Sequence, residues 1–224
     1  MDERKQKILQ LIVESYTSTA EPVGSKFLVE ECGLDVSGAT VRNEMRDLEE
    51  QGYLTHPHTS SGRMPTEMGY EYYVERIMKP RSLSKKIQQE LESAADDDRK
   101  QHLKTMAKYI AEKSQSAVIV AFGEDSLYYT GISNLFSQAE FRDYAYAVRV
   151  STIFDQVEER IDSVFEILHK ENPEILIGGK NPFGAMCGLV GGQLADGALF
   201  AILGPLRMDY AQGSSFIDYL QKQS

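Results

Sequence analysis

Pro22, Gly33 and Gly52 divide the start of the chain into three stretches that are each expected to be helical. Residues 3–19 carry apolar side chains three and four positions apart, and Pro22 prevents the helix from continuing through the next turn. Residues 25–30 form a second, short stretch, which Gly33 closes. Helices this short, joined by tight turns, are typical of a helix-turn-helix unit.

The third stretch has the clearest signals for where it begins and which side faces inward. Ser37 is the expected N-cap, and Gly52 ends the helix. In the second stretch Ser25 is expected to cap in the same way. The expected inward-facing residues are Phe27 and Leu28 in the second stretch and Val41, Met45 and Leu48 in the third.

The opposite side of the third stretch carries residue types that suit DNA. At one hundred degrees per residue, Ala39, Asn43 and Arg46 face away from the stripe, with Arg42 at the edge. Arginine pairs with guanine and asparagine with adenine, while the small residues Gly38, Ala39 and Thr40 allow close approach. The first turns of a recognition helix are the part that enters the major groove.

Acidic residues limit this surface to the first half of the third stretch. Glu44, Asp47, Glu49 and Glu50 lie in its second half, where phosphates would repel them. The alternative is an amphipathic helix whose polar side only meets water, and the pattern by itself does not decide between the two.

A turn-rich segment follows, "PHTSSGRMPT" at residues 57–66. Tyr53 to Thr55 favours a strand, and residues 63–66 return, so the sequence predicts a small hairpin. Such a hairpin after a recognition helix can insert one cation into the minor groove. Arg63, beside a glycine that permits close backbone approach, is the expected exposed contact. His56 and His58 are weak evidence for a metal site and are expected instead at the surface or on phosphates.

The remainder of the chain predicts a connecting region and a second domain. Residues 66–78 resume a helix capped by Thr66, which is expected to pack on the first helix. Residues 79–115 indicate a charged linker and exposed helices. Buried strands are expected in "SAVIVAF", "EILIGG" and "GALFAILGP", and a further strand in "DSLYYTGI" with a turn at Gly131. A long helix is expected in residues 144–170 and a terminal helix in "FIDYLQKQ". Mixed strands and helices predict a compact α/β or α+β domain.

The glycine-rich segment "IGGKNPFGAMCGLVGG" matches neither a phosphate-binding Walker loop nor GxGxxG. We expect a connection in which Asn181 caps a short helix that has Pro182 at its first position. A small effector at that helix N-terminus is the alternative. The sequence indicates no catalytic arrangement, so no enzyme and no cofactor are predicted.

The composition of the chain argues against several classes of protein. The net charge of −10 argues against a protein that coats nucleic acid indiscriminately, although a few placed cations can still form a local surface. Cys32 and Cys187 are expected as reduced, buried thiols of a cytoplasmic protein. No membrane span and no signal peptide are expected.

Several stretches together resemble a known family. "AEPVGS", "SGATVRNEMRDLEEQGYL" and "PHTSSGRMPTEMGYEYYV" are similar to the N-terminal part of HrcA, the bacterial heat-shock repressor family, almost continuously from Asp2 to Val74. The similarity returns in "LYYTGISNLFSQAEF", "ILIGGKNPF" and "LGPLRMDY". Little sequence separates Ser114 from the first of these, so the chain resembles a shortened member that lacks most of the inserted dimerisation domain and part of the GAF-like sheet.

The resemblance implies an α+β protein with a winged helix-turn-helix at residues 1–78, connecting helices at 79–115 and a reduced GAF-like dimerisation and regulatory domain at 116–224. It implies a homodimer that represses chaperone genes by binding the inverted repeat called CIRCE, with a GroE-type chaperonin as a further partner. The implied DNA-binding residues are Ser37, Thr40, Arg42, Asn43, Arg46, His58, Thr59, Ser60 and Arg63.

Two other functions remain open from the sequence. One is a protein-interaction module that keeps the winged-helix fold without binding DNA. The other is a small-molecule sensor or an enzyme with the glycine-rich segment as its site.

Overall fold

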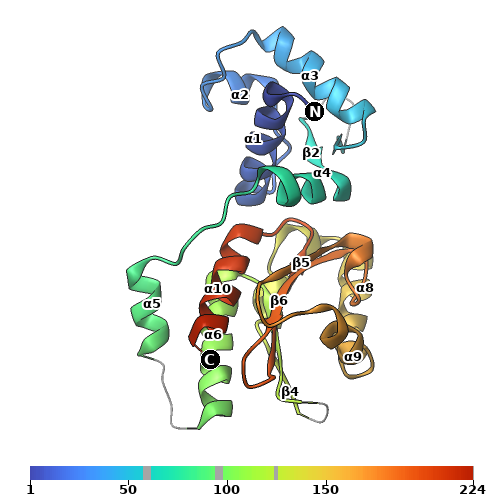
Figure 1. Ribbon diagram of the computed structural model, residues 1–224. Helices are drawn as coiled ribbons and strands as arrows, with labels where there is room; N and C mark the ends of the chain where they lie inside the picture. Colours follow the sequence, from blue (N-terminus) through green and yellow to red (C-terminus); the bar gives the residue numbers. More distant parts are fainter. Residues whose placement is uncertain (58–61, 94–97, 124–125, 224) are drawn as a thin grey trace. The chain divides into compact units, whose positions relative to one another are not determined.

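The computed structural model describes residues 1–57, 62–93, 98–123 and 126–223. The chain forms two compact units, residues 1–79 and residues 80–224 (Figure 1). The predicted mixture of helix and sheet is confirmed, since the second unit contains a five-stranded antiparallel sheet.

The first unit begins with three helices, α1 (Glu3–Thr19), α2 (Ser25–Glu30) and α3 (Gly38–Glu50). The predicted stripe on α3 is confirmed, because Val41, Met45 and Leu48 are buried. They pack with the buried side of α1, formed by Ile8, Leu9, Ile12 and Val13, and with Leu28 of α2. Ser37 caps α3 as expected, its Oγ accepting the Thr40 N–H at an N···O distance of 3.1 Å.

Two expectations for α2 were wrong. Its N-cap is Gly24, without a side-chain bond, and Ser25 is already the first helical residue. Phe27 is 41% exposed while its neighbour Leu28 is fully buried. A helix of six residues covers the core with one side only, and Leu28 takes that side.

A short hairpin follows α3, with β1 (Leu54–Thr55) antiparallel to β2 (Met64–Pro65). Arg63 extends it through a bridge to Val23: the Val23 N–H donates to the Arg63 carbonyl at 2.8 Å, and the Arg63 N–H donates to the Val23 carbonyl at 2.9 Å. The segment after α1 therefore pairs with the strand that returns from the hairpin.

The unit closes with α4 (Glu67–Tyr72), which continues into a π-helical turn, η1 (Tyr73–Ile77). Thr66 caps α4 as predicted, its Oγ1 accepting the Gly69 N–H at 3.1 Å and donating to the Gly52 carbonyl at 2.6 Å. Packing on α1 is also confirmed, because the buried Tyr73 donates its hydroxyl hydrogen to Glu14 at 3.4 Å.

In the second unit the strands are β3 (Ala117–Ala121), β4 (Leu127–Thr130), β5 (Glu174–Ile177), β6 (Cys187–Gln193) and β7 (Leu199–Pro205). They lie in the order β4-β3-β7-β6-β5, and every neighbouring pair is antiparallel. All residues of β3 and β7 are buried, as expected for the centre of a covered sheet.

Helices cover both faces of this sheet (Figure 1). One face packs on α8 (Tyr144–Asp155) and α9 (Val157–Ile167), with α7 (Ile132–Phe136) and the 3-10 turn η2 (Ala139–Arg142) beside them. The other face meets α6 (Arg99–Ser114) and α10 (Tyr210–Gln223). The short helix α5 (Lys85–Glu92) joins α6 through a bond from the Tyr109 hydroxyl to Glu90.

Three expectations for the second unit were wrong. The glycine-rich connection contains β6, a buried strand between β5 and β7. Asn181 does not cap a helix: it follows the 3-10 turn η3 (Gly178–Lys180), and its side chain bonds the Phe183 N–H and the Cys187 carbonyl. The long helix of residues 144–170 is divided between α8 and α9 at Gln156.

Candidate nucleic-acid interface

The exposed side of α3 presents the residues that its periodicity predicted. Ala39, Arg42, Asn43 and Arg46 are exposed, and so is the capping Ser37, while Thr40 is half-buried. The Thr40 hydroxyl lies 2.9 Å from Ser37 Oγ, so the first turn of the helix is fixed by two bonds to one serine. The first turn carries no acidic residue, which leaves the positive end of the helix dipole unopposed there.

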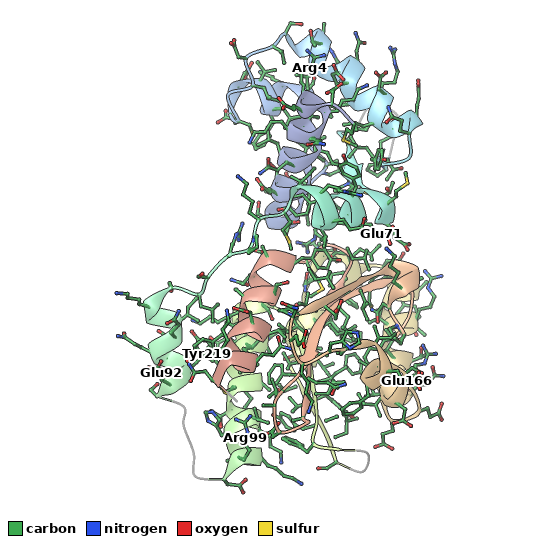
Figure 2. All side chains as sticks on the ribbon, in the orientation of Figure 1. Arg4, Glu71, Glu92, Arg99, Glu166 and Tyr219 are labelled. Carbon is green, nitrogen blue, oxygen red and sulfur yellow. The ribbon has the colours of Figure 1, made fainter. Side chains whose placement is uncertain are left out.

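All four acidic residues in the second half of α3 are engaged in ion pairs, three of them with cations from outside the helix. Glu44, only 8% exposed, accepts from Arg4 Nε at 2.9 Å and has Lys5 Nζ at 3.7 Å. Asp47 lies 3.1 Å from the same ammonium group, and its hydrogen bond raises the pKa of Lys5 above the ordinary value. Figure 2 shows Arg4 at the start of α1, next to α3.

The third acidic residue, Glu49, contacts both arms of the hairpin. One carboxylate oxygen bonds His56 Nδ1, just after β1, and the other lies 2.8 Å from Arg63 Nε, just before β2. The remaining residue, Glu50, has Arg46 at 3.9 Å, and both side chains are well exposed. The expected repulsion by these carboxylates is therefore reduced by cations of the same unit.

This arrangement corrects the expected role of Gly62 and Arg63 as an exposed tip. The Arg63 side chain is 21% exposed and is paired with Glu49. A Cβ on Gly62 would lie 2.5 Å from the Val23 carbonyl carbon, so the glycine permits close approach of the Pro22–Val23 backbone. The other expected wing residues, His58, Thr59 and Ser60, lie outside the described residues.

The structure thus brings Ser37, Thr40, Arg42, Asn43 and Arg46 onto one helix and places Arg63 at the end of that helix. Sequence reasoning missed Arg4, Lys5, Glu49 and His56 as parts of the surrounding network. For Glu44 the sequence did contain a sign that it needs a partner, because this residue lies along the helix between the buried Val41 and Leu48. A carboxylate in such a position needs a cation from another element.

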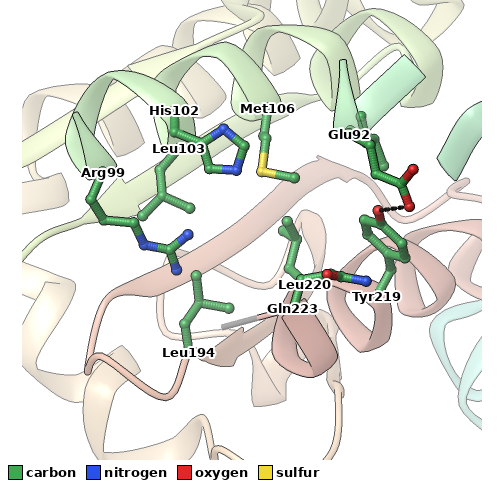
Figure 3. A pocket seen from close by; sticks show the side chains of 10 residues that line it. Glu92, Arg99, His102, Leu103, Met106, Leu194, Tyr219, Leu220 and Gln223 are labelled. Carbon is green, nitrogen blue, oxygen red and sulfur yellow. Dashed lines mark hydrogen bonds between the residues drawn. The ribbon is translucent and has the colours of Figure 1, made fainter. Parts of the chain in front are cut away.

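The second unit has a cavity of about 190 Å³ between α5, α6 and α10. Figure 3 shows apolar side chains at its centre, with Arg99 and His102 at one end and Tyr219, bonded to Glu92, at the other. Its lining residues are Leu91, Glu92, Arg99, His102, Leu103, Met106, Leu194, Tyr219, Leu220 and Gln223. The cavity does not coincide with the glycine-rich segment, whose first part is the turn η3 and the loop after it and whose last part is β6.

The cysteines and histidines form no group that could hold a metal ion within the described part of the chain. Both cysteines are free thiols, Cys187 buried and Cys32 half-buried, so full burial was predicted correctly for Cys187 alone. Burial raises the pKa of the Cys187 thiol to about 12. Across the same residues no helix is long and apolar enough to cross a bilayer.

Curated relatives of the chain are transcription repressors. "Heat-inducible transcription repressor HrcA" of Acetivibrio thermocellus is 44% identical over 127 residues, which are 55% of this chain and 36% of that protein. The protein of that name from Carboxydothermus hydrogenoformans is 52% identical over 97 residues, 43% of this chain and 28% of the relative. The matched segments therefore span about a third of the relatives' length or less. These relatives indicate a class of regulators rather than of enzymes.

The family model described as "HrcA protein C terminal domain" matches residues 70–213, more than half of the 224 residues. The chain belongs to the HrcA family. A solved structure described as a hypothetical protein is similar over 100% of this chain and 97% of its own, with a TM-score of 0.75 and 17% identity. At that identity the similarity concerns the fold.

Proposed function

We propose that the chain is a sequence-specific DNA-binding repressor of heat-shock genes. In this proposal residues 1–78 form a winged helix-turn-helix, residues 79–115 connect, and residues 116–224 form a reduced GAF-like unit that pairs two copies. The observation that carries the proposal is the exposed side of α3, where Arg42, Asn43 and Arg46 lie outside the core on a capped helix. Membership of a family whose named relatives are heat-inducible repressors supports the same conclusion.

The residue types on α3 determine how it would recognise DNA. The capped first turn enters the major groove, where Ser37 and Thr40 bond phosphate and the small Ala39 permits approach. Arg42 and Asn43, exposed in the second turn, reach base edges, and Arg46 contacts the backbone. The ion pairs of Glu44 and Asp47 reduce the repulsion that these carboxylates would otherwise exert on phosphates.

The hairpin between β1 and β2 would act as the wing. Its returning strand is held by the bridge from Arg63 to Val23 and by the bond from Thr66 to the Gly52 carbonyl. His58, Thr59, Ser60 and Arg63 are the proposed wing contacts. A hairpin directly after α3 can follow the DNA backbone while the helix occupies the groove.

Two copies are needed for a specific operator. One short recognition helix contacts few base pairs, and two-fold pairing on an inverted repeat such as CIRCE multiplies the specificity. We propose that the second unit supplies the pairing, that a GroE-type chaperonin is a further partner, and that the protein acts in the cytoplasm, where the operator lies.

Gel-shift titration against a CIRCE-type inverted repeat, and against a single half-site, tests the proposal. We expect the parent to bind the full repeat more tightly, and Arg42→Ala to lower the affinity about 10- to 100-fold, because a base contact is lost. Arg149→Ala, which removes an exposed arginine from α8, is the matched control and should bind like the parent.

Two outcomes would contradict the proposal. Equal binding by the Arg42→Ala variant and the parent would exclude α3 as the reading surface. Equal affinity for the half-site and the full repeat would exclude two-fold pairing, and sedimentation of the DNA complex would confirm this.

A further inference from the structure

Glu49 lies on the DNA-facing edge of α3 in the proposed complex. It follows Arg42 by seven positions, so the two side chains project within about 20° of each other around the helix axis. An acidic group there would repel phosphates. Its position therefore calls for an explanation, and the explanation rests on the proposed DNA binding.

Both carboxylate oxygens of Glu49 are engaged by cationic or hydrogen-bonding groups of the hairpin. His56 Nδ1 bonds one oxygen, and Arg63 Nε lies 2.8 Å from the other. The side chains of Glu49 and Arg63 are 22% and 21% exposed, so solvent screens this pair less than the neighbouring Arg46–Glu50 pair, which is 3.9 Å apart and far more exposed.

A carboxylate and a phosphate offer a guanidinium group the same kind of acceptor. We propose that Glu49 is an intramolecular substitute for a DNA phosphate: it holds Arg63 in the free protein and releases it to the operator backbone on binding. Glu49 is thus a positioning residue that sets how much of the charge of Arg63 is available to DNA. The Arg63 backbone stays fixed by its bridge to Val23 during the exchange, so the side chain alone has to move.

The dependence of affinity on salt tests this exchange, because each phosphate neutralised by the protein steepens the slope of log K against log salt by about 0.9. The full-length chain is titrated with the inverted-repeat duplex at several salt concentrations. Glu49→Gln should raise the affinity about 3- to 10-fold at low salt, because binding no longer breaks the ion pair with Glu49. It should also steepen the slope by about 0.9, because in the parent the carboxylate freed on binding takes up a cation and offsets the one released from the phosphate.

Two variants serve as matched controls. Glu50→Gln removes the same charge one residue away without touching Arg63, and it should leave the slope unchanged. Arg63→Gln in the Glu49→Gln background should abolish the gain in affinity for the duplex. The same substitution in the parent should lower the affinity by a smaller factor than it does in that background. Thermal unfolding of each variant verifies that the fold is retained.

The contrary outcomes can be told apart. If the parent binds the duplex and Glu49→Gln binds no more tightly than Glu50→Gln, the exchange is wrong and DNA binding stands. If Glu49→Gln binds more weakly with an unchanged slope, Glu49 holds the hairpin in place and the exchange is again wrong. If the parent shows no salt-dependent binding, the DNA-binding proposal fails and this inference fails with it.

Discussion

Different kinds of interaction stabilise each of the two units internally. In the second, β3 and β7 bury every residue, and the sheet is covered by helices on both faces. In the first, short helices enclose a smaller apolar core, and ion pairs from Arg4, Lys5 and Arg63 to the acidic side of α3 surround it. The stability of the first unit should therefore respond to charge and salt, and that of the second to packing.

The ion pairs of the first unit also bear on the proposed DNA binding. In the proposed complex, the cations that pair with Glu44, Asp47 and Glu49 reduce the repulsion between the second half of α3 and DNA. Charge placement, rather than the net charge of −10, decides what this surface can bind.

The largest expected effect comes from the sheet. Phe200 of β7 is fully buried, so Phe200→Ala should lower the free energy of unfolding of the second unit by about 3–5 kcal/mol. Each unit contains one cysteine, so thiol labelling can follow the two units separately. Cys187 is buried and its thiol pKa is raised to about 12, so its labelling requires the second unit to open. Compared with the parent, Phe200→Ala should be labelled at Cys187 at a lower urea concentration, whereas the urea dependence of Cys32 labelling should not change.

Tyr144→Ala is the control for that substitution, because Tyr144 is 82% exposed and its loss should change the stability by less than about 0.5 kcal/mol. If Phe200→Ala shifts the labelling of both cysteines equally, the units unfold together and the contrast between them is wrong.

A smaller effect is expected at the hairpin of the first unit. Gly62→Ala would place a Cβ 2.5 Å from the Val23 carbonyl carbon, and relieving this contact should cost about 1–3 kcal/mol. Gly38→Ala is the matched control, because no atom lies within 4 Å of a Cβ there. Urea unfolding followed by circular dichroism measures both. Equal stability of the two variants would show that the hairpin backbone is free to move away from Pro22 and Val23.

Features that depend on local sequence could be predicted. The cap and buried stripe of α3, the cap of α4 by Thr66 and the apolar strand β3 follow from neighbouring residue types. Strand β6 could not be predicted in this way, because Gly188, Gly191 and Gly192 lower strand propensity. A residue far away in the sequence explains why a glycine is needed at position 188, because a Cβ there would lie 2.3 Å from the Tyr210 hydroxyl oxygen.

The candidate interface shows the same division. Helical period was sufficient to place Arg42, Asn43 and Arg46 on the outside of α3. The pairing of Arg63 with Glu49 joins residues fourteen positions apart, and that of Arg4 with Glu44 joins residues forty apart. Such contacts depend on how the hairpin and α1 fold back onto α3, which the local pattern does not encode.

The smallest expected effect compares two serines at helix starts in the first unit. Ser37 accepts the Thr40 N–H and caps α3, whereas Ser25 follows Gly24, the N-cap of α2. Ser37→Ala should lower the free energy of unfolding by about 1 kcal/mol, because the N–H of Thr40 loses its acceptor. Ser25→Ala should change it by less than about 0.5 kcal/mol.

Urea unfolding without DNA, at low and at high salt, measures this last pair and sharpens the contrast between the units. The loss from Ser37→Ala should be nearly the same at both salt concentrations, because a bond between a hydroxyl and an N–H involves no net charge. Stability lost by Lys5→Ala, in contrast, should shrink at high salt, since the ion pair with Asp47 is screened. If both losses are independent of salt, the ion pairs around α3 do not stabilise the first unit, and the contrast between the two units is wrong.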